Sequence, residues 1–290
     1  MIETLFKTTY EKRPNGMYYC VSEESAHHEI KKVEMETYSH RADEFAEAHM
    51  MQLPKQEHAS LSPMRTLPKG AVVVELGGGD GRFGFQLMRE GFRVVESDIA
   101  PGTVERVKEV AEKNGLQGEY AVIDAEDLPF RDESVDAVMM VATFHHLPDV
   151  KRALLEFKRV LKPGGKVVLL REPASWQYSA FGWFYDILRH VLRSRNHNHI
   201  SHADDETHGF TRAKVFELFS DTFTDVELVP VQYIEKVYLQ YVVLKSKLLK
   251  KNFEPAAWIT KPLQAIDNVI RKIPILKNTT WDWDIIATKK

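Results

Sequence analysis

The sequence predicts an α/β fold, in which a mostly parallel sheet carries helices on both faces. Two observations support this prediction. Between residues 70 and 171, short apolar runs alternate with amphipathic stretches, which is the pattern of strand–helix–strand units. Each amphipathic stretch ends at glycine or proline, as helices do before a following strand. The alternation indicates five strands in this region.

The apolar runs of this region have the length and the Val-rich composition of buried strands. The expected strands are 71–76, 92–98, 119–124, 135–142 and 166–172, and the expected helices are 82–90, 102–114 and 149–161. Two more strands are expected at 225–231 and 281–288, and Thr211 is expected to cap a helix before the first of them. The sheet therefore has seven expected strands.

The rest of the chain predicts additions to this sheet. Residues 1–65 predict a helical cap or lid, helical from about residue 23 to 51, and residues 66–290 predict one domain with two insertions. The insertion at 174–210 holds five histidines and an acidic patch. The insertion at 233–278 is mostly helical, with breaks expected at Pro255, Pro262 and Pro274.

Composition limits the class of protein. With 43% hydrophobic and 28% charged residues, the chain can bury a real core and is not disordered. The single cysteine, Cys20, excludes an internal disulfide and a multi-cysteine metal cluster, and it fits a reducing compartment. The first residues lack the apolar stretch of a secretory signal, and no run approaches the roughly 20 apolar residues that span a bilayer. We expect a cytoplasmic protein.

Charge is unevenly distributed along the chain. The net charge of −3 gives no reason to expect a nucleic-acid partner. Residues 231–290 nevertheless hold 11 Lys and Arg against 5 Asp and Glu. Within this region, the segment 236–251 combines an apolar face with several lysines. We favour a helix that covers the active site, and the alternative is transient contact with a membrane surface. The sequence carries no signal for an oligomeric state.

A glycine-rich loop follows the first expected strand, in the segment VVVELGGGDGRFG (72–84). Glycine accepts positive φ and lets a ligand approach the backbone, so the loop predicts binding of a nucleotide-like molecule. GDGRFG also matches the dinucleotide fingerprint G-x-G-x-x-G, which keeps an NAD(P)-dependent oxidoreductase as an alternative. If that fingerprint is aligned on Gly77, where the strand ends, Arg82 takes the place of the third glycine. The dinucleotide interpretation therefore fits poorly.

Five segments of the chain together resemble the class I S-adenosylmethionine-dependent methyltransferases, in particular the broad ubiquinone/menaquinone-biosynthesis type (methyltransferase type 11). The loop matches the first motif of that family at Glu75, Gly77, Gly79 and Gly81. The other segments are the strand that ends at Asp98, IDAEDLPFRDESVD (123–136), VATFHHLPD (141–149) and RVLKPGGKVVLL (159–170). They follow the order of the family over roughly residues 70–172, more than a third of the chain. The resemblance implies a Rossmann-like seven-stranded sheet and a small-molecule methyltransferase that uses S-adenosylmethionine and releases S-adenosylhomocysteine.

The resemblance also implies which residues hold the cofactor. Asp98 would hold the ribose hydroxyls, and Asp124 and the Ala125 amide would meet the adenine, with Glu126 beside them. Glu75 would face the cationic amino-acid part of the cofactor. Tyr38 is expected to close over the cofactor or to pack in its helix, and Gly78 contacts the cofactor or only permits close packing. The expected cofactor-binding set is Tyr38, Glu75, Gly77, Gly78, Gly79, Gly81, Asp98, Ile99, Asp124, Ala125, Glu126, Val141 and Ala142.

The methyl acceptor is less clearly marked. His145 and His146 follow the fourth expected strand and are candidate bases, in that order, although a structural role in the turn before Pro148 is favoured. The histidines of NHNHISH (196–202) show no recognised ligand spacing, so no metal site is expected.

Two further features bear on the class of acceptor. The chain lacks the N-P-P-Y type motif of methyltransferases that modify bases and amides, which favours an oxygen or carbon of a small, aromatic or lipid-like acceptor. Because no residue is an unmistakable base, a non-catalytic cofactor-binding or peripheral membrane protein remains a third hypothesis.

Overall fold

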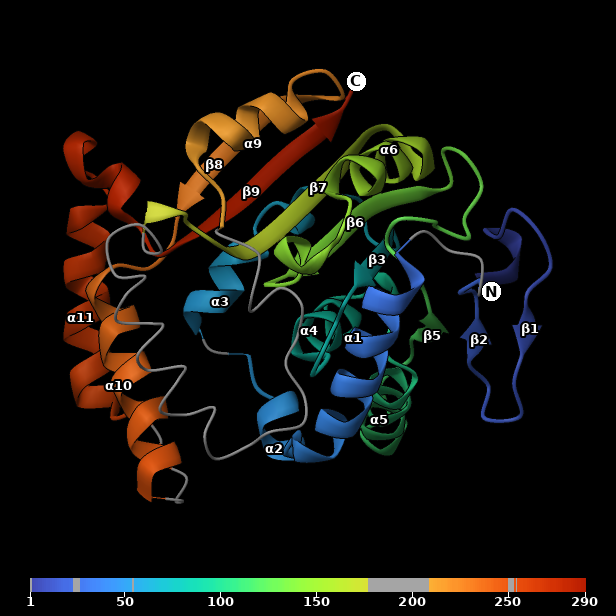
Figure 1. The fold of residues 1–290 in the computed structure, drawn as a ribbon, viewed down its shortest axis with the longest axis horizontal. Helices are drawn as coiled ribbons and strands as arrows, with labels where there is room; N and C mark the ends of the chain where they lie inside the picture. The colour runs from blue at the N-terminus through green and yellow to red at the C-terminus, as the bar shows by residue number, and fades with distance from the viewer. Residues whose placement is uncertain (1, 23–26, 54, 177–208, 250–252, 254) are drawn as a thin grey trace.

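The computed structural model describes residues 2–22, 27–53, 55–176, 209–249, 253 and 255–290. The described part of the chain is built around a nine-stranded sheet with the order β1-β2-β5-β4-β3-β6-β7-β9-β8 (Figure 1). Neighbouring strands from β5 to β7 are parallel, and β9 pairs antiparallel with both β7 and β8. The strands of this seven-stranded core are β3 (Val72–Leu76), β4 (Arg93–Asp98), β5 (Glu119–Val122), β6 (Val135–Val141), β7 (Leu161–Pro173), β8 (Phe223–Pro230) and β9 (Asp282–Lys289). The expected Rossmann-like α/β fold is confirmed.

Helices cover both faces of this sheet. On one face, Phe83 and Leu87 of α4 (Arg82–Arg89) pack with Val73 of β3, and α5 (Pro101–Lys113) buries its own apolar stripe nearby. On the other face, Phe157 of α6 (Val150–Val160) and Phe219 of α9 (Arg212–Phe219) pack with β6 and β7. The Thr211 side chain accepts a hydrogen bond from the Lys214 amide, which confirms the expected cap of α9.

The amino-terminal segment adds two strands that the sequence did not indicate. β1 (Glu11–Lys12) and β2 (Tyr18–Tyr19) form a hairpin, and β2 pairs in parallel with β5. The expected number of seven strands was therefore too low, because two-residue strands are too short to leave an alternating pattern. The following helices are α1 (His28–Arg41), α2 (Glu47–Met50) and α3 (Lys55–Ser60), so the expected helix is interrupted. The division of the chain at residue 65 stays a prediction.

The carboxyl-terminal insertion forms a pair of packed helices, α10 (Ile234–Leu249) and α11 (Ala257–Ile270). Figure 1 shows the pair at the left edge of the molecule, beside the ends of β8 and β9. The Asp267 carboxylate accepts hydrogen bonds from the amides of Tyr233, Ile234 and Glu235, and thereby ties the start of α10 to α11. Pro262 lies inside α11, so the break expected there was wrong.

The helices of the described chain include none that combines the length and the apolar character needed to cross a membrane. The histidine-rich insertion expected at 174–210 falls almost wholly outside the described residues.

Two buried carboxyl groups lie between the sheet and α4. Glu75 and Glu96 are paired neighbours on β3 and β4, and both side chains are buried. A Cβ atom at Gly84 would lie 1.3 Å from Glu96 Oε1, so α4 can approach these groups only with glycine at this position. Burial raises the pKa of Glu75 to about 8, and burial together with the nearby Glu75 raises the pKa of Glu96 well above its usual range. The pair therefore retains a proton at neutral pH.

This retained proton predicts how stability depends on pH. Above the ordinary carboxyl pKa of about 4.3, the unfolded chain releases protons that the folded pair keeps, so folding stability falls as pH rises from about 4.5 to 8. Glu96→Gln replaces one of the two carboxyl groups by an amide that does not titrate. The variant should therefore lose less stability than the parent as the pH rises. We expect the variant to melt higher than the parent at pH 8, by about 2–4 °C for each kcal/mol regained. Thermal unfolding by circular dichroism at pH 5 and pH 8 measures this.

The matched control is Glu44→Gln, which neutralises an exposed carboxyl group and should leave the pH dependence unchanged. If the melting temperature fell as steeply between pH 5 and pH 8 in Glu96→Gln as in the parent, the buried pair would not retain a proton at neutral pH.

Candidate functional site

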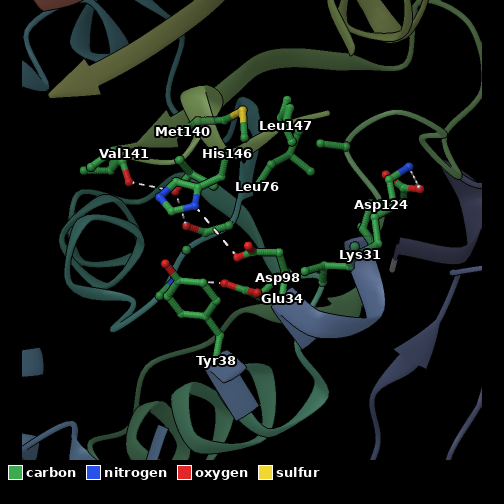
Figure 2. A pocket seen from close by; sticks show the side chains of 18 of the residues that line it. Lys31, Glu34, Tyr38, Leu76, Asp98, Asp124, Met140, Val141, His146 and Leu147 are labelled. Atoms are coloured by element: carbon green, nitrogen blue, oxygen red, sulfur yellow. Dashed lines mark hydrogen bonds and ion pairs between the residues drawn. The ribbon is translucent and has the colours of Figure 1, made fainter. Parts of the chain in front are cut away.

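A cavity of about 320 Å³ opens at the carboxyl ends of β3, β4 and β6, with side chains of α1 forming part of its wall (Figure 2). Parallel strands place the loops that follow them at one edge of the sheet, which is where open α/β sheets bind their ligands. The expected residues that line the cavity are Tyr38, Gly77, Gly78, Gly79, Asp98, Ile99, Asp124, Ala125, Val141, Ala142 and His146. Glu75, Gly81, Glu126 and His145 do not belong to this lining.

The glycine loop is held against the turn that follows β6. The Thr143 hydroxyl, a single donor, lies within hydrogen-bonding distance of the carbonyl oxygens of Gly77, at 3.0 Å, and of Val141, at 2.8 Å. Gly77 has a φ of +63°, and a Cβ atom there would lie 2.2 Å from Thr143 Cγ2. Only glycine satisfies both conditions, so the close approach of the loop to this turn depends on Gly77.

Asp98 ends β4 and points into the cavity beside the loop (Figure 2). Its two carboxylate oxygens accept hydrogen bonds from the amides of Ala100, at 2.9 Å, and of Gly79, at 3.2 Å. Burial raises the pKa of Asp98 to about 6, against the lowering effect of these backbone hydrogen bonds. At neutral pH the group is mostly an acceptor-only carboxylate, and it has acceptor capacity beyond the two amides. It can therefore bind a ligand that presents hydroxyl donors.

Asp124 follows β5 and is paired with a lysine that sequence reasoning missed. Lys31 Nζ lies 2.7 Å from Asp124 Oδ2 and 2.8 Å from Glu126 Oε2, and its side chain is only 5% exposed. The remaining Asp124 oxygen accepts a hydrogen bond from the Glu126 amide, and Glu126 also accepts one from the Asp149 amide. This buried triad connects α1 to the sheet edge. Ninety-three positions separate Lys31 from Asp124, and no local pattern marked them as partners.

Glu172, near the end of β7, is a second residue that the sequence analysis missed. Its side chain is fully buried and accepts hydrogen bonds from the amides of Thr143, Phe144 and His145, at 3.0–3.1 Å. Glu172 Oε2 also lies 2.9 Å from His145 Nδ1. A single carboxyl group thus organises the turn after β6. An acidic residue at the end of a buried strand was the available signal, as it was for Asp98.

The two candidate bases occupy different surroundings. His146 lines the cavity, with its ring centroid 6.0 Å from that of Tyr38 and its Nδ1 3.8 Å from Glu34 Oε2. His145 turns instead to Glu172. Of the two expected candidates only His146 lines this cavity, and a catalytic role for either histidine stays a prediction.

Glu75 does not line this cavity, and its expected contact with the cofactor stays a prediction. Successive side chains of a strand point to opposite faces, and Leu76 takes the position that faces the cavity. Glu75 therefore points to the α4 face, where it meets Glu96 and not the cavity. Glu126 shares Lys31 with Asp124 and donates its amide hydrogen to the Asp124 carboxylate, and Gly81 precedes α4 in close contact with Val107 of α5. These three residues support the wall of the cavity without lining it.

The helices of 233–278 contribute no residue to the cavity lining in the described chain, so the favoured interpretation of this segment as a roof over the site is not supported.

Comparisons with known proteins agree with this geometry. Residues 74–169 match the methyltransferase domain family. The chain is 35% identical over 120 residues to a demethylmenaquinone methyltransferase of Thermus thermophilus, which is 41% of this chain and 54% of that protein. It is 32% identical over 137 residues to a ubiquinone biosynthesis O-methyltransferase of Xanthomonas axonopodis pv. citri, which is 46% of this chain and 57% of that protein. The chain thus spans about half the length of the curated relatives it matches.

Solved structures share the fold. Phosphoethanolamine N-methyltransferase 2 of Haemonchus contortus, in complex with S-adenosyl-L-methionine, superposes with a TM-score of 0.53 at 17% identity, over 80% of this chain and 52% of that chain. At this identity the likeness concerns the fold alone. The chain therefore shares the fold of these structures, and residues 74–169, which include the loop and strands that form the cavity, resemble methyltransferase domains in sequence.

Proposed function

We propose that the protein binds S-adenosylmethionine in this cavity and transfers its methyl group to an oxygen or carbon of a small-molecule acceptor. The observation that carries the proposal is Asp98, a buried carboxylate that faces the cavity at the end of β4, next to the glycine loop. An acidic residue at this position can hold both hydroxyls of a ribose. The match of residues 74–169 to methyltransferase domains supports the same cofactor.

The residues of the cavity fit the parts of this cofactor. Asp98 would accept hydrogen bonds from the two ribose hydroxyls. Ile99 and Ala125 would make apolar contacts with the adenine. Asp124 would accept a hydrogen bond from the adenine amino group, because Lys31 and the Glu126 amide hold its carboxylate in place at the cavity wall. The backbone at Gly77 and Gly79 would approach the amino-acid part without steric hindrance from a side chain. Tyr38, on α1, would close the cavity from the other side.

The cofactor would supply a methyl group on a sulfonium, and the protein's task is to hold donor and acceptor in line. A hydroxyl acceptor must also lose a proton as its bond to the methyl carbon forms. His146 lies at the cavity wall and is suited to take that proton, with S-adenosylhomocysteine as the other product. The names of the relatives, which concern menaquinone and ubiquinone biosynthesis, favour a hydroxylated aromatic acceptor.

Other functions are separated from this one by the ligand that binds. A fold alone does not determine function, and the G-x-G-x-x-G match is the only feature that favours a nicotinamide cofactor. A scaffold without catalytic activity would bind S-adenosylmethionine but transfer no methyl group. Calorimetry of ligand binding and an assay of methyl transfer distinguish these cases.

Asp98→Ala is expected to weaken binding of S-adenosylhomocysteine by about 100-fold or more, because two hydrogen bonds to a charged acceptor are lost, each of about 1.5–3 kcal/mol. Isothermal titration calorimetry measures the dissociation constant. Asp127→Ala is the matched control: it removes a carboxylate that pairs with Lys7 outside the cavity, and it should bind like the parent.

The binding proposal fails if the parent chain binds neither S-adenosylmethionine nor S-adenosylhomocysteine. Tight binding of NADH in the same assay would instead favour the oxidoreductase.

His146→Ala is expected to lower kcat by about 10²–10⁴-fold and to leave the affinity for S-adenosylhomocysteine nearly unchanged, because the base acts on the acceptor. Transfer of labelled methyl from S-adenosylmethionine to a panel of phenols and demethylated quinols measures turnover. His145→Asn, which keeps a donor toward Glu172, should retain most activity. Unchanged turnover in His146→Ala would rule out His146 as the base.

A further inference from the structure

Helix α11 buries a charged side chain and exposes a stripe of apolar ones. Its buried side chain is Asp267, which is 3% exposed, whereas Trp258 and Val269 are 78% and 61% exposed. A helix that packs on a protein core normally directs its apolar stripe inward and its charges outward. Single exposed apolar residues need no explanation, but a stripe on one helix indicates that something covers it.

Internal contacts fix α11 in this orientation. Gln264, Asp267 and Arg271 line a second cavity, of about 630 Å³, between α11 and the strands β8 and β9. Asp267 accepts three hydrogen bonds from the start of α10, and the Gln264 side chain donates one to Glu235 Oε1, at 2.7 Å. Rotating the helix to bury its apolar residues would break all four bonds. The apolar stripe therefore stays outside.

Exposed apolar residues also occur in the segments before and after α11. On α10, the exposed residues Ile234, Val237, Tyr241 and Leu249 recur at helical spacing and share one face of the helix. After α11, Ile273 and Ile275 are also exposed, the latter at 87%. We call these residues, together with Trp258, Ile266 and Val269, the outer apolar surface.

The charge around the outer apolar surface is positive. Residues 233–278 contain nine Lys and Arg and three Asp and Glu. Both acidic residues of this segment that the structure describes, Glu235 and Asp267, are buried. Lys261 and Lys272 are exposed on or next to α11, so basic groups flank the apolar side chains. A partner that covers this surface should be apolar inside and negatively charged at its boundary.

We propose that the outer apolar surface binds an anionic phospholipid bilayer, with α10 and α11 lying in its interfacial layer. Apolar residues, an exposed Trp and Tyr, and flanking lysines are the features by which helices bind such surfaces. A second copy of the chain is a poorer fit, because two segments of balance +6 would then face each other. This inference does not rest on methyl transfer.

The test is sedimentation of the full chain with vesicles of phosphatidylglycerol and phosphatidylcholine in equal parts, and with vesicles of phosphatidylcholine alone. We expect binding to the anionic vesicles to be about tenfold or more stronger, and to weaken at high salt. The double variant Trp258→Glu, Val269→Glu should lose about tenfold or more of that affinity. Leu155→Glu, at a 62% exposed apolar position of α6, is the matched control and should bind like the parent.

Trp258→Phe keeps the surface apolar and supplies an independent readout. Anionic vesicles should shift the tryptophan fluorescence of the parent to shorter wavelength, and Trp258→Phe should remove most of that shift while still sedimenting with the vesicles. The proposal is overturned by absence of binding to anionic vesicles, or by equal loss in Leu155→Glu. A dimer in analytical ultracentrifugation that Val269→Glu dissociates would also overturn it, by identifying a second copy as the partner.

Discussion

Buried carboxylates at the carboxyl edge of the sheet are the constraint on which the rest of the site depends. A buried charge is costly unless donors surround it, so each of these groups must find partners. Glu172 finds them in the turn after β6, and Glu126 finds them in Lys31 and the Asp149 amide. Asp98 has backbone amides beside it and faces the cavity. The chain therefore satisfies some of these groups itself and leaves acceptor capacity at Asp98 for a ligand.

The same satisfied groups give the cavity its shape. Because Glu172 holds the turn after β6, Thr143 can clamp Gly77, and His146 is placed at the cavity wall. Because Lys31 is paired with Asp124 and Glu126, α1 is attached to the sheet edge and brings Tyr38 to the cavity. The N-terminal segment thus completes the site through one buried ion triad. Removing Lys31 alone would leave the buried carboxylates of Asp124 and Glu126 without their shared cation. Loss of one partner of a buried ion pair strongly destabilises the folded state.

Local patterns in the sequence were sufficient to predict the parallel sheet, the glycine loop and Asp98, because strand alternation and glycine spacing are read within a few residues. The contacts that join distant segments could not be predicted in this way: Lys31 with Asp124, and Glu172 with the turn at 143–146, depend on tertiary packing. Glu75 lies on the α4 side of the sheet and not in the cavity lining, because one residue of register decides which face a strand side chain meets. For α11, periodicity predicted a helix, but the side that faces inward is fixed by the hydrogen bonds of Asp267 to the start of α10, which no local pattern indicates.

A crystal structure of the protein with S-adenosylhomocysteine would test the role of Asp98 directly. The account predicts both ribose hydroxyls within hydrogen-bonding distance of the Asp98 carboxylate, and the adenine beside Ile99 and Ala125, with Lys31 still paired to Asp124. A ligand bound elsewhere, or one whose ribose makes no contact with Asp98, would contradict it.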